Sequence, residues 1–352
     1  MKTIVLTGGG SSGHVTPNIA LIPKLKELGY TIHYIGSKNG LEKQLIQKEG
    51  ITYHAINAGK LRRYLDYKNI TDIFRVMHGF RQALSVINKL KPDIVFSKGG
   101  FVSCPVVWAA WVLRVPIVIH ESDMTPGLTN KLSMPFAKQV CYTFPESGIH
   151  IPKDKGVLTG VPIREDILNG DKNIGLRMCD FNNLKPVLMV VGGSQGAESI
   201  NQIIRNSLPE LLKDFQICHM CGKGNINPDF NDTKGYKQFE YINKGLPHIY
   251  AMADIVISRA GATTLFEVLS LRKPNILIPL SKNASRGDQI LNAESFKKQG
   301  FSSVINEEQL SAETMLKSIS EVYKNRDKYL NAMDLRNTGV ATDMVIKVLQ
   351  CL

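Results

Sequence analysis

Short apolar runs alternate with longer stretches of helical periodicity along the first third of the chain. The runs are typical of buried strands, and the stretches between them repeat apolar positions at helical spacing. Strands that alternate with helices in this way predict a parallel, doubly wound sheet. The expected strands are Thr3–Leu6, Thr31–Ile35, Tyr53–Ile56, Asp93–Ser97 and Pro116–His120, and the expected helices are Pro17–Leu28, Gly40–Lys48 and Pro105–Leu113.

The same pattern begins again at residue 186, and 352 residues exceed what one core usually supports. We therefore expect two similar α/β domains, residues 1–163 and 164–352, with the final helix free to pack back on the first. Gly, Asn, Asp and Lys concentrate at the boundary, Gly160–Lys185. In the second domain the expected strands are Pro186–Val191, Gln216–Met220, Ile255–Ser258 and Asn275–Pro279, and the expected helices are Ile200–Leu212 and one from about Thr263.

A glycine-rich loop follows the first strand. Its Gly8-x-Gly10-x-x-Gly13 spacing matches the dinucleotide fingerprint, but that fingerprint also needs an acidic residue at the end of the second strand. Residues 34–39 contain none, so we favour a loop that holds phosphate or sugar over a dinucleotide site or a packing loop. His14 follows this loop at a helix start, where the dipole favours a neutral imidazole that can accept a proton; capping or packing is the alternative.

A second glycine-rich loop, Gly192–Gly196, surrounds Ser194. Serine there typically caps the next helix, and a capping serine can also face a phosphate. A serine hydrolase is disfavoured because no suitable triad partners accompany the Gly-x-Ser-x-Gly letters.

The stretch 254–289 reads as strand, small-residue turn, helix, strand and polar loop. The turn directs unpaired backbone N–H groups and the positive end of a helix dipole at one point, which favours a diphosphate. Glu267, one turn into that helix, suits a ribose diol. Arg286, Asp288 and Gln289 follow the next strand at the same sheet edge. The stretch therefore predicts a nucleotide-sugar site.

Composition is that of a globular protein, with 43% hydrophobic and 21% charged residues. No signal peptide precedes the first strand and the six cysteines are scattered, which favours reduced thiols in a cytoplasm. Cys218 and Cys221 have a C-x-x-C spacing, but they lie in an expected strand and lack a second ligand pair. Metal or redox use is therefore disfavoured.

The net charge is +12, and Lys60–Lys91 carries half of it. A basic excess favours anionic partners such as nucleic acid, phosphorylated ligands or an anionic membrane. The same segment has amphipathic spacing from Ile70 to Ile87, which indicates a helix that packs on the sheet or lies on acidic lipid, with Trp108 and Trp111 as possible neighbours. No stretch is apolar enough to span a bilayer; the nearest, Phe101–Ile119, contains two prolines and an arginine.

Seven motifs in order connect the chain with a known family. They are Gly8-Gly9-Gly10-Ser11-Ser12-Gly13-His14, Ser97-Lys98-Gly99-Gly100-Phe101, His120-Glu121-Ser122-Asp123, Gly160-Val161-Pro162-Ile163-Arg164, Gly192-Gly193-Ser194-Gln195-Gly196, Ser258-Arg259-Ala260-Gly261-Ala262-Thr263 with Glu267, and Asp288-Gln289. By these motifs the chain closely resembles the MurG-type N-acetylglucosaminyltransferases of bacterial peptidoglycan synthesis, along both domains.

The resemblance implies the GT-B fold, two Rossmann-like domains facing a cleft. It implies inverting transfer of GlcNAc from UDP-GlcNAc to the 4-hydroxyl of the muramyl-pentapeptide on undecaprenyl diphosphate, in cell-wall biogenesis, cell shape and division. Rival activities are transfer to diacylglycerol or a soluble aglycone by the same fold, and non-catalytic nucleotide-sugar binding. The implied location is the cytoplasmic face of the cell membrane, on anionic lipid, with no nucleic acid, metal or cofactor.

The resemblance also assigns site residues. Ile242 meets the uracil, Glu267 the ribose and Gln289 the GlcNAc. His14 is the expected base, with Glu121 in reserve. The family often has Asn where this chain has Asp123 and Gln where it has Asp288, which bears on how the GlcNAc hydroxyls are held. The diphosphate and sugar ligands are Arg164, Ser194, Ala262, Thr263, Thr264, Leu265 and Phe266, and the acceptor-side residues are Ser11, Ser12, Gly13 and Asp123.

Overall fold

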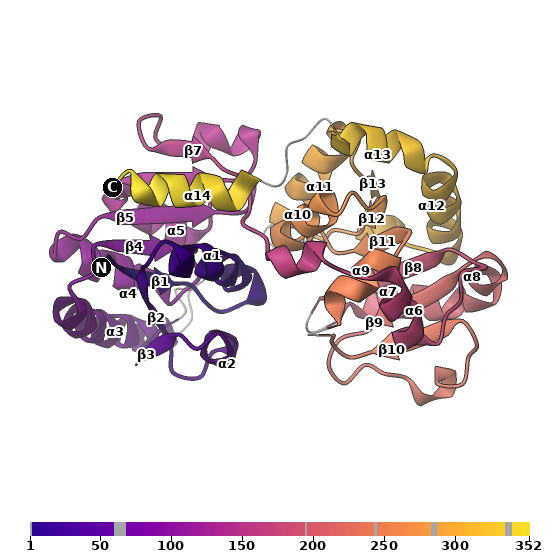
Figure 1. The fold of residues 1–352 in the computed structure, drawn as a ribbon, viewed down its shortest axis with the longest axis horizontal. Helices are drawn as coiled ribbons and strands as arrows, with labels where there is room; N and C mark the ends of the chain where they lie inside the picture. Colours follow the sequence, from indigo (N-terminus) through magenta and orange to yellow (C-terminus); the bar gives the residue numbers. More distant parts are fainter. Residues whose placement is uncertain (1, 60–67, 194–195, 243–244, 283–286, 335–339) are drawn as a thin grey trace. The chain divides into compact units, whose positions relative to one another are not determined.

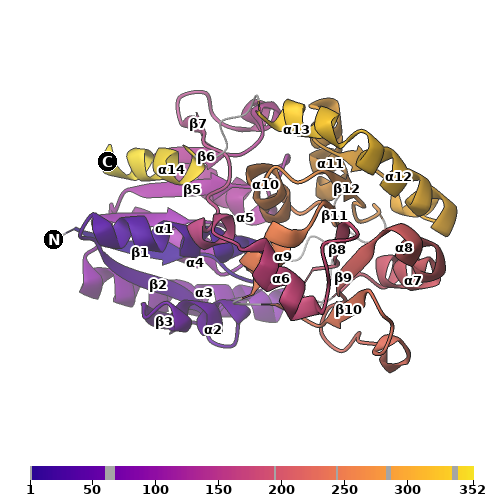
Figure 2. The ribbon, with the colours of Figure 1, turned by 45° about the vertical axis from the view of Figure 1, so that its right-hand side comes forward.

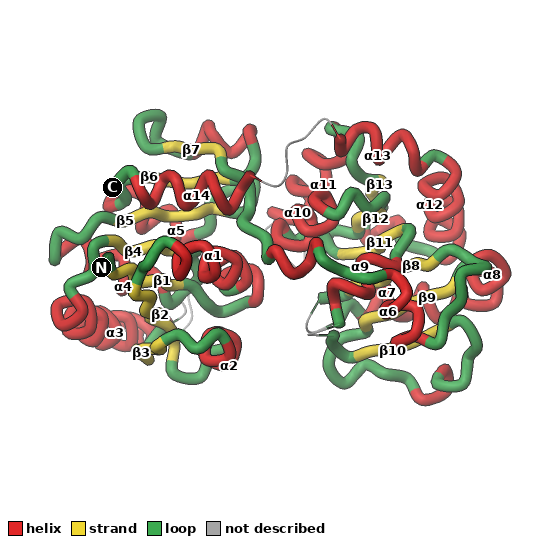
Figure 3. The backbone as a smooth tube through the Cα atoms, in the orientation of Figure 1, coloured by secondary structure: helices red, strands yellow, loops and turns green. Residues whose placement is uncertain are grey.

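The computed structural model describes residues 2–59, 68–193, 196–242, 245–282, 287–334 and 340–352 (Figure 1). Within these ranges the chain forms two compact units, Met1–Arg164 with Gly339–Leu352, and Glu165–Thr338. Each unit has its own parallel sheet with helices on both faces (Figure 3). The predicted class, two doubly wound α/β domains, is confirmed.

In the described residues the first unit forms a seven-stranded parallel sheet with the order β3-β2-β1-β4-β5-β6-β7. Its central strands consist largely of Ile and Val because both faces are covered by helices. At the carboxyl edge, Thr7 of β1 pairs with Ile35 on one side and Ser97 on the other. The strands are β1 (Thr3–Thr7), β2 (Thr31–Ser37), β3 (Thr52–Ile56), β4 (Ile94–Ser97), β5 (Ile117–Glu121), β6 (Gln139–Tyr142) and β7 (Gly156–Leu158).

The helices of the first unit cover opposite faces of its sheet. Ile4 and Leu6 of β1 pack with the first, second and last helices, whereas Val5 packs with the third and fourth. This division follows from the alternation of side chains along a strand. The helices are α1 (Thr16–Glu27), α2 (Leu41–Lys48), α3 (Lys68–Leu90), α4 (Ser103–Val112), α5 (Leu128–Ser133) and α14 (Ala341–Gln350), with short 3₁₀ helices η1 (Ser12–His14), η2 (Met134–Phe136) and η3 (Pro145–His150).

The described part of the second unit forms a six-stranded parallel sheet with the order β10-β9-β8-β11-β12-β13. The order again reverses at the strand that precedes the glycine-rich loop. The strands are β8 (Val187–Val191), β9 (Gln216–Met220), β10 (Tyr236–Phe239), β11 (Ile255–Ser258), β12 (Asn275–Leu277) and β13 (Ser303–Val304).

In the second unit, α7, α8 and α12 pack on one face of the sheet, and α9 with α6 lies on the other (Figure 2). The predicted single helix Ile200–Leu212 was wrong, because the structure breaks it at Ser207. Pro209 lies in the first turn of α8, where its missing N–H is tolerated, but it could not donate inside a continuous helix. The helices are α6 (Lys172–Cys179), α7 (Glu198–Asn206), α8 (Leu208–Asp214), α9 (Leu246–Met252), α10 (Ala262–Ser270), α11 (Asp288–Lys298), α12 (Ala312–Lys324) and α13 (Arg326–Asp334), with η4 (Glu165–Leu168), η5 (Pro228–Phe230) and η6 (Glu307–Gln309).

The final helix belongs to the first unit although it follows the second unit in the chain. Val345, Ile346 and Leu349 of α14 are buried in the same core as α1 and β1. The first unit therefore consists of two chain segments, and Arg164 is the last residue of the longer one.

Strand order reverses between β1 and β4 in the first unit, and between β8 and β11 in the second. At such a reversal the connections leave in opposite directions and open a crevice at the carboxyl ends of the strands, where ligands bind. The loops that begin at Gly8, Lys98, Gly192 and Arg259 follow these four strands. The topology thus places two potential ligand sites, one on each sheet.

We expect Leu349→Ala to destabilise the first unit by about 2–4 kcal/mol, because Leu349 is 2% exposed and its truncation leaves a cavity. Both tryptophans, Trp108 and Trp111, lie in α4, so their fluorescence during urea unfolding reports the first unit. Gln350→Ala, an exposed neighbour, is the control. An unchanged tryptophan midpoint for Leu349→Ala would contradict the assignment of α14 to this core.

Candidate active site

Two glycine-rich loops lie side by side at the reversal point of the first sheet, Gly8–Gly13 after β1 and Lys98–Phe101 after β4. The Gly9 N–H donates to the Gly99 carbonyl at 3.3 Å. Gly100 has a φ of +83°, and a Cβ there would lie 2.0 Å from the Gly9 carbonyl oxygen. Only glycine allows the two backbones to approach so closely.

Three of the four acceptor-side residues expected from the sequence, Ser11, Ser12 and Gly13, lie on the outer part of the first loop. Ser11 and Ser12 are exposed, and Gly13 and His14 are half-buried at η1, just before α1. Ser11 Oγ lies 3.0 Å from His14 Nδ1. This hydrogen bond orients the imidazole at the sheet edge, where a substrate proton could be taken.

A fully buried glutamate supports the same loop from within. Glu42 Oε1 accepts hydrogen bonds from the Ser37 N–H at 3.1 Å and the Ser37 hydroxyl at 2.5 Å, and Oε2 accepts from the Gly10 N–H at 3.4 Å. A Cβ at Gly9 or Gly40 would lie within 2.7 Å of this carboxylate. Glu42 therefore joins the end of β2 to the first glycine-rich loop.

The third functional segment of the first sheet follows β5. Glu121 is 4% exposed, and its carboxylate accepts hydrogen bonds from the Asp123 N–H at 3.0 Å, the Gly127 N–H at 3.0 Å and the Asn130 amide at 2.9 Å. These bonds hold the loop that carries half-buried Asp123. Because both of its oxygens accept hydrogen bonds from this segment, the Glu121 carboxylate is suited to fixing the conformation of the loop after β5.

Lys98 and His120 are buried beneath these loops. Lys98 Nζ donates to the Ser122 hydroxyl. Burial lowers the pKa of Lys98, although the negative charges of Glu121 and Asp123 act in the opposite direction. Burial and the charge of Lys98 lower the pKa of His120 to about 3. His120 is thus neutral near pH 7, and it donates through Nε2 to the Gly160 carbonyl at 2.7 Å. Both side chains support the loops from below.

On the second sheet, the turn after β11 leads into α10. Gly261 is the N-cap residue and has no side chain to cap the first turn, so N–H groups at Ala262, Thr263 and Thr264 face the carboxyl edge of the sheet. Ala262 and Leu265 are buried, while Thr263, Thr264 and Phe266 are half-buried. This helix start has the properties of an anion site.

Glu267 lies one turn further along α10 and is 8% exposed. The Tyr250 hydroxyl of α9 donates to Glu267 Oε2 at 3.3 Å, which orients the carboxylate beside the helix start. Ile242 is buried after β10, and half-buried Gln289 lies in the first turn of α11. Ser194 and Arg286 fall outside the described residues, and half-buried Arg164 ends the longer segment of the first unit.

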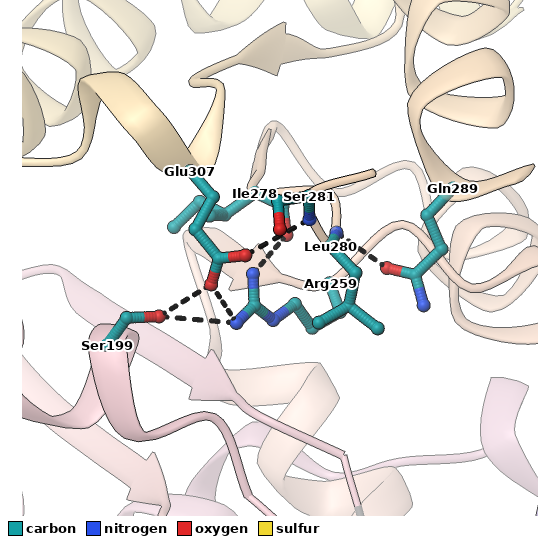
Figure 4. Close-up of polar contacts among 7 residues, drawn as sticks. All are labelled: Ser199, Arg259, Ile278, Leu280, Ser281, Gln289 and Glu307. Atoms are coloured by element: carbon teal, nitrogen blue, oxygen red, sulfur yellow. Dashed lines mark hydrogen bonds and ion pairs between the residues drawn. The ribbon is translucent and has the colours of Figure 1, made fainter. Parts of the chain in front are cut away.

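Arg259 and Glu307 form an ion pair at the same edge of the second sheet (Figure 4). Arg259 Nη2 lies 2.5 Å from Glu307 Oε1 and 3.2 Å from Ser199 Oγ, and Nη1 donates to the Ile278 carbonyl at 3.2 Å. Glu307 Oε2 accepts from the Ser281 N–H at 3.1 Å. Burial alone raises the pKa of Glu307, but these hydrogen bonds and the charge of Arg259 outweigh it and lower that pKa.

The C-x-x-C cysteines are buried at the end of β9. A hydrogen bond with Cys179, together with burial, raises the pKa of Cys218, and burial raises that of Cys221. Among the described residues, no cluster of three or more His, Cys, Asp or Glu side chains is placed to hold a metal ion.

Sequence reasoning did not identify Glu42 and Glu307 as supporting residues, and it noted Lys98 only as part of a motif. They lie outside the strands, and their partners are 5 to 48 residues away in the chain. Arg259 was noted only as part of a motif. The sequence signal that could have found these residues is an ionisable side chain at a position that an apolar helix face or a strand end is expected to bury, because a buried charge needs a partner.

Sequence models of two known domain families match most of the chain. Residues 4–142 match the glycosyltransferase family 28 N-terminal domain, and residues 187–346 match the family 28 C-terminal domain. The crystal structure of Acinetobacter baumannii MurG has the same fold, with a TM-score of 0.78 at 23% identity and 100% coverage of both chains. Two Rossmann-like sheets with these matches define a glycosyltransferase of the GT-B class.

Closer relatives specify the family. The UDP-N-acetylglucosamine–N-acetylmuramyl-(pentapeptide) pyrophosphoryl-undecaprenol N-acetylglucosamine transferase of Clostridium perfringens SM101 is 56% identical over 347 residues, which is 99% of this chain and 97% of the relative. The protein of that name from Lachnoclostridium phytofermentans is 57% identical over 350 residues, 99% of each chain. The chain belongs to this family of MurG-type N-acetylglucosaminyltransferases, and the resemblance drawn from its motifs is confirmed.

We expect Glu42→Gln to loosen the first glycine-rich loop, because the amide nitrogen would place N–H donors against the N–H group of Gly10 or Ser37. Losing a buried acceptor costs about 1–3 kcal/mol. Hydrogen exchange measured by mass spectrometry should be faster in peptides containing Gly8–Gly13 and unchanged around Gly261. Exposed Glu27→Gln is the matched control. Unchanged exchange in the loop would show that Glu42 does not support it.

Proposed function

We propose that this enzyme transfers GlcNAc from UDP-GlcNAc to the 4-hydroxyl of the muramyl-pentapeptide on undecaprenyl diphosphate, with inversion, and so converts lipid I to lipid II. The observation that carries the proposal is the 56–57% identity to transferases of that name along nearly the whole chain. Inversion requires direct attack by the acceptor hydroxyl on the face of the anomeric carbon opposite the UDP leaving group.

The second unit supplies the donor site in this proposal, apart from Arg164, which is the last residue of the longer segment of the first unit. The uncapped start of α10, with Ser194 and Arg164, binds the diphosphate and stabilises the negative charge that develops on departing UDP. Glu267 accepts hydrogen bonds from the ribose hydroxyls in the orientation set by Tyr250. The backbone at Ile242 contacts the uracil, and Gln289 contacts the GlcNAc.

The first unit supplies the acceptor site. The loop Ser11–Gly13 and Asp123 face the acceptor diphosphate and the reacting sugar. His14 takes the proton of the attacking hydroxyl; its ring is oriented by Ser11 and is partly accessible. Glu121 is less suited to this step because backbone and amide groups already bond both of its carboxylate oxygens.

Two alternatives predict different products. A transferase of the same fold that uses diacylglycerol or a soluble aglycone would label those acceptors. A non-catalytic nucleotide-sugar-binding protein would bind UDP and label no acceptor. The identity to the relatives above favours the lipid-linked muramyl acceptor.

We expect the purified chain, given labelled UDP-GlcNAc, to label a polyprenyl-diphosphate-muramyl acceptor and neither diacylglycerol nor a soluble aglycone. In the same assay His14→Ala should lose about 10²–10⁴-fold in turnover, the usual contribution of a general base, and keep its affinity for UDP. Transfer to another acceptor alone would overturn the proposed substrate. Near-normal turnover by His14→Ala would exclude that residue as the base.

We also propose that the enzyme binds the anionic inner face of the cell membrane through α3. Val76, Ala83 and Ile87 of α3 are buried against the first unit, whereas Phe74 and Met77 are 67% and 53% exposed. Phe74, Met77, Arg75, His78 and Arg81 line a surface hollow of about 580 Å³ together with Asn57. Exposed apolar side chains beside arginines suit the headgroup region of acidic lipid.

This location agrees with a lipid-linked acceptor. Within the described ranges, every helix is too short or too polar to cross a bilayer. Arg62 and Arg63, which the sequence also suggested for this surface, fall outside the described residues.

Replacing Arg75 and Arg81 with Ala should weaken binding to phosphatidylglycerol-containing vesicles by about 30-fold at low salt, at about 1 kcal/mol for each charge. Sedimentation with vesicles measures the change. Lys297→Ala with Lys298→Ala, on an exposed part of α11, is a control with the same charge change. Equal losses in both double variants would mean that net charge, and not α3, determines binding.

A further inference from the structure

The Arg259–Glu307 pair connects four separate segments at the carboxyl edge of the second sheet. Arg259 lies in the turn between β11 and α10, and Glu307 begins η6. Ser199, in the first turn of α7, bonds both partners: its hydroxyl lies 2.8 Å from Glu307 Oε1 and 3.2 Å from Arg259 Nη2. The fourth segment is residues 278–281, which follow β12: its Ile278 carbonyl accepts from Arg259, and its Ser281 N–H donates to Glu307 (Figure 4).

A cation in the turn before α10 would be expected to contact the donor diphosphate. The structure directs the guanidinium elsewhere, because both terminal nitrogens bond protein acceptors. The Arg259 and Glu307 side chains are only 13% and 20% exposed. Displacing either side chain would leave the other charge partly buried and unpaired, which is costly. The pair therefore holds the segments that it bonds in one arrangement.

The segment 278–281 in turn orients Gln289. The Leu280 N–H donates to Gln289 Oε1 at 3.2 Å, so the Gln289 amide NH₂ points away from that segment (Figure 4). An NH₂ group only donates hydrogen bonds, so in this orientation Gln289 presents a donor for a hydroxyl oxygen. The orientation depends on where the Leu280 N–H lies.

We propose that Arg259 and Glu307 are positioning residues that hold residues 278–281, and through them the Gln289 amide, in the geometry that recognises the donor sugar. This inference rests on the proposed function, in which Gln289 contacts the GlcNAc. The pair acts on the sugar and not on the nucleotide. Uridine and diphosphate recognition lies at Ile242, the α10 start and Glu267, none of which bonds the pair in the described contacts.

The attachment of α11 limits the effect to this segment. Asn292 is fully buried and its amide donates to the Ala260 carbonyl at 3.3 Å, so α11 keeps a bond to the turn that does not involve the pair. Loss of the pair should release residues 278–281 without displacing the helix that carries Gln289.

The test compares the binding of UDP-GlcNAc with that of UDP to the full chain by isothermal titration calorimetry, without acceptor. For Arg259→Ala and for Glu307→Gln we expect at least tenfold weaker UDP-GlcNAc binding and UDP binding within twofold of wild type. The UDP measurement also shows that the second unit has folded. Glu307→Gln keeps the side-chain shape if Arg259→Ala fails to fold.

Arg272→Ala is the matched control. Arg272 lies 2.5 Å from Asp334, the same distance as in the proposed pair, but their side chains are 53% and 48% exposed. We expect this variant to bind both ligands as wild type does.

The outcomes separate the two proposals. Variants that bind UDP-GlcNAc as tightly as wild type, or that lose UDP and UDP-GlcNAc equally, would overturn the positioning role alone. A wild-type chain that binds no UDP-GlcNAc would overturn the proposed function and this inference with it. Wild-type binding with the expected difference, but without transfer to the lipid acceptor, would overturn only the catalytic proposal.

Discussion

Parallel pairing of β1 with β4, and of β8 with β11, is the constraint on which both functional sites depend. Parallel strands bring their carboxyl ends to one edge, and the reversal of strand order there separates the connections that follow. Backbone N–H groups at that edge cannot all pair within the sheet or the helices. In the second unit the start of α10, which no side chain caps, lies at that edge, and in the first unit the glycines let two loops approach each other closely.

Buried or partly buried glutamates give these loops their shape. Glu42 bonds the first glycine-rich loop, Glu121 bonds the loop after β5, and Glu307 bonds residues 278–281. In each case the carboxylate accepts at least one backbone N–H from a loop at the carboxyl edge of a sheet, namely from Gly10, Asp123 or Ser281. Charge-assisted hydrogen bonds are stronger than neutral ones, so a single side chain can order several backbone groups. The loops that face the substrates can then consist of small and polar residues, whose own packing would not fix their conformation.

Fold and function rest on different observations here. A TM-score of 0.78 at 23% identity establishes the architecture, which many glycosyltransferases with unlike acceptors share. The assignment to the MurG-type family comes from relatives that are more than half identical along nearly the whole chain. The structure adds the physical reason for particular motif residues, such as the close approach of Gly100 to Gly9.

Local physical chemistry determined much of this protein. Apolar runs predicted the strands, glycine spacing predicted the loops at the sheet edges, and the motifs predicted the family, because these properties depend on neighbouring residues. The break at Ser207 within an apparently continuous helix also has a local cause, Pro209, which the apolar pattern did not register. Tertiary structure alone decided the return of α14 to the first core and the pairing of Arg259 with Glu307. Those two features depend on contacts between residues 48 or more apart in the chain, and a linear pattern does not record which distant side chain will be buried against which.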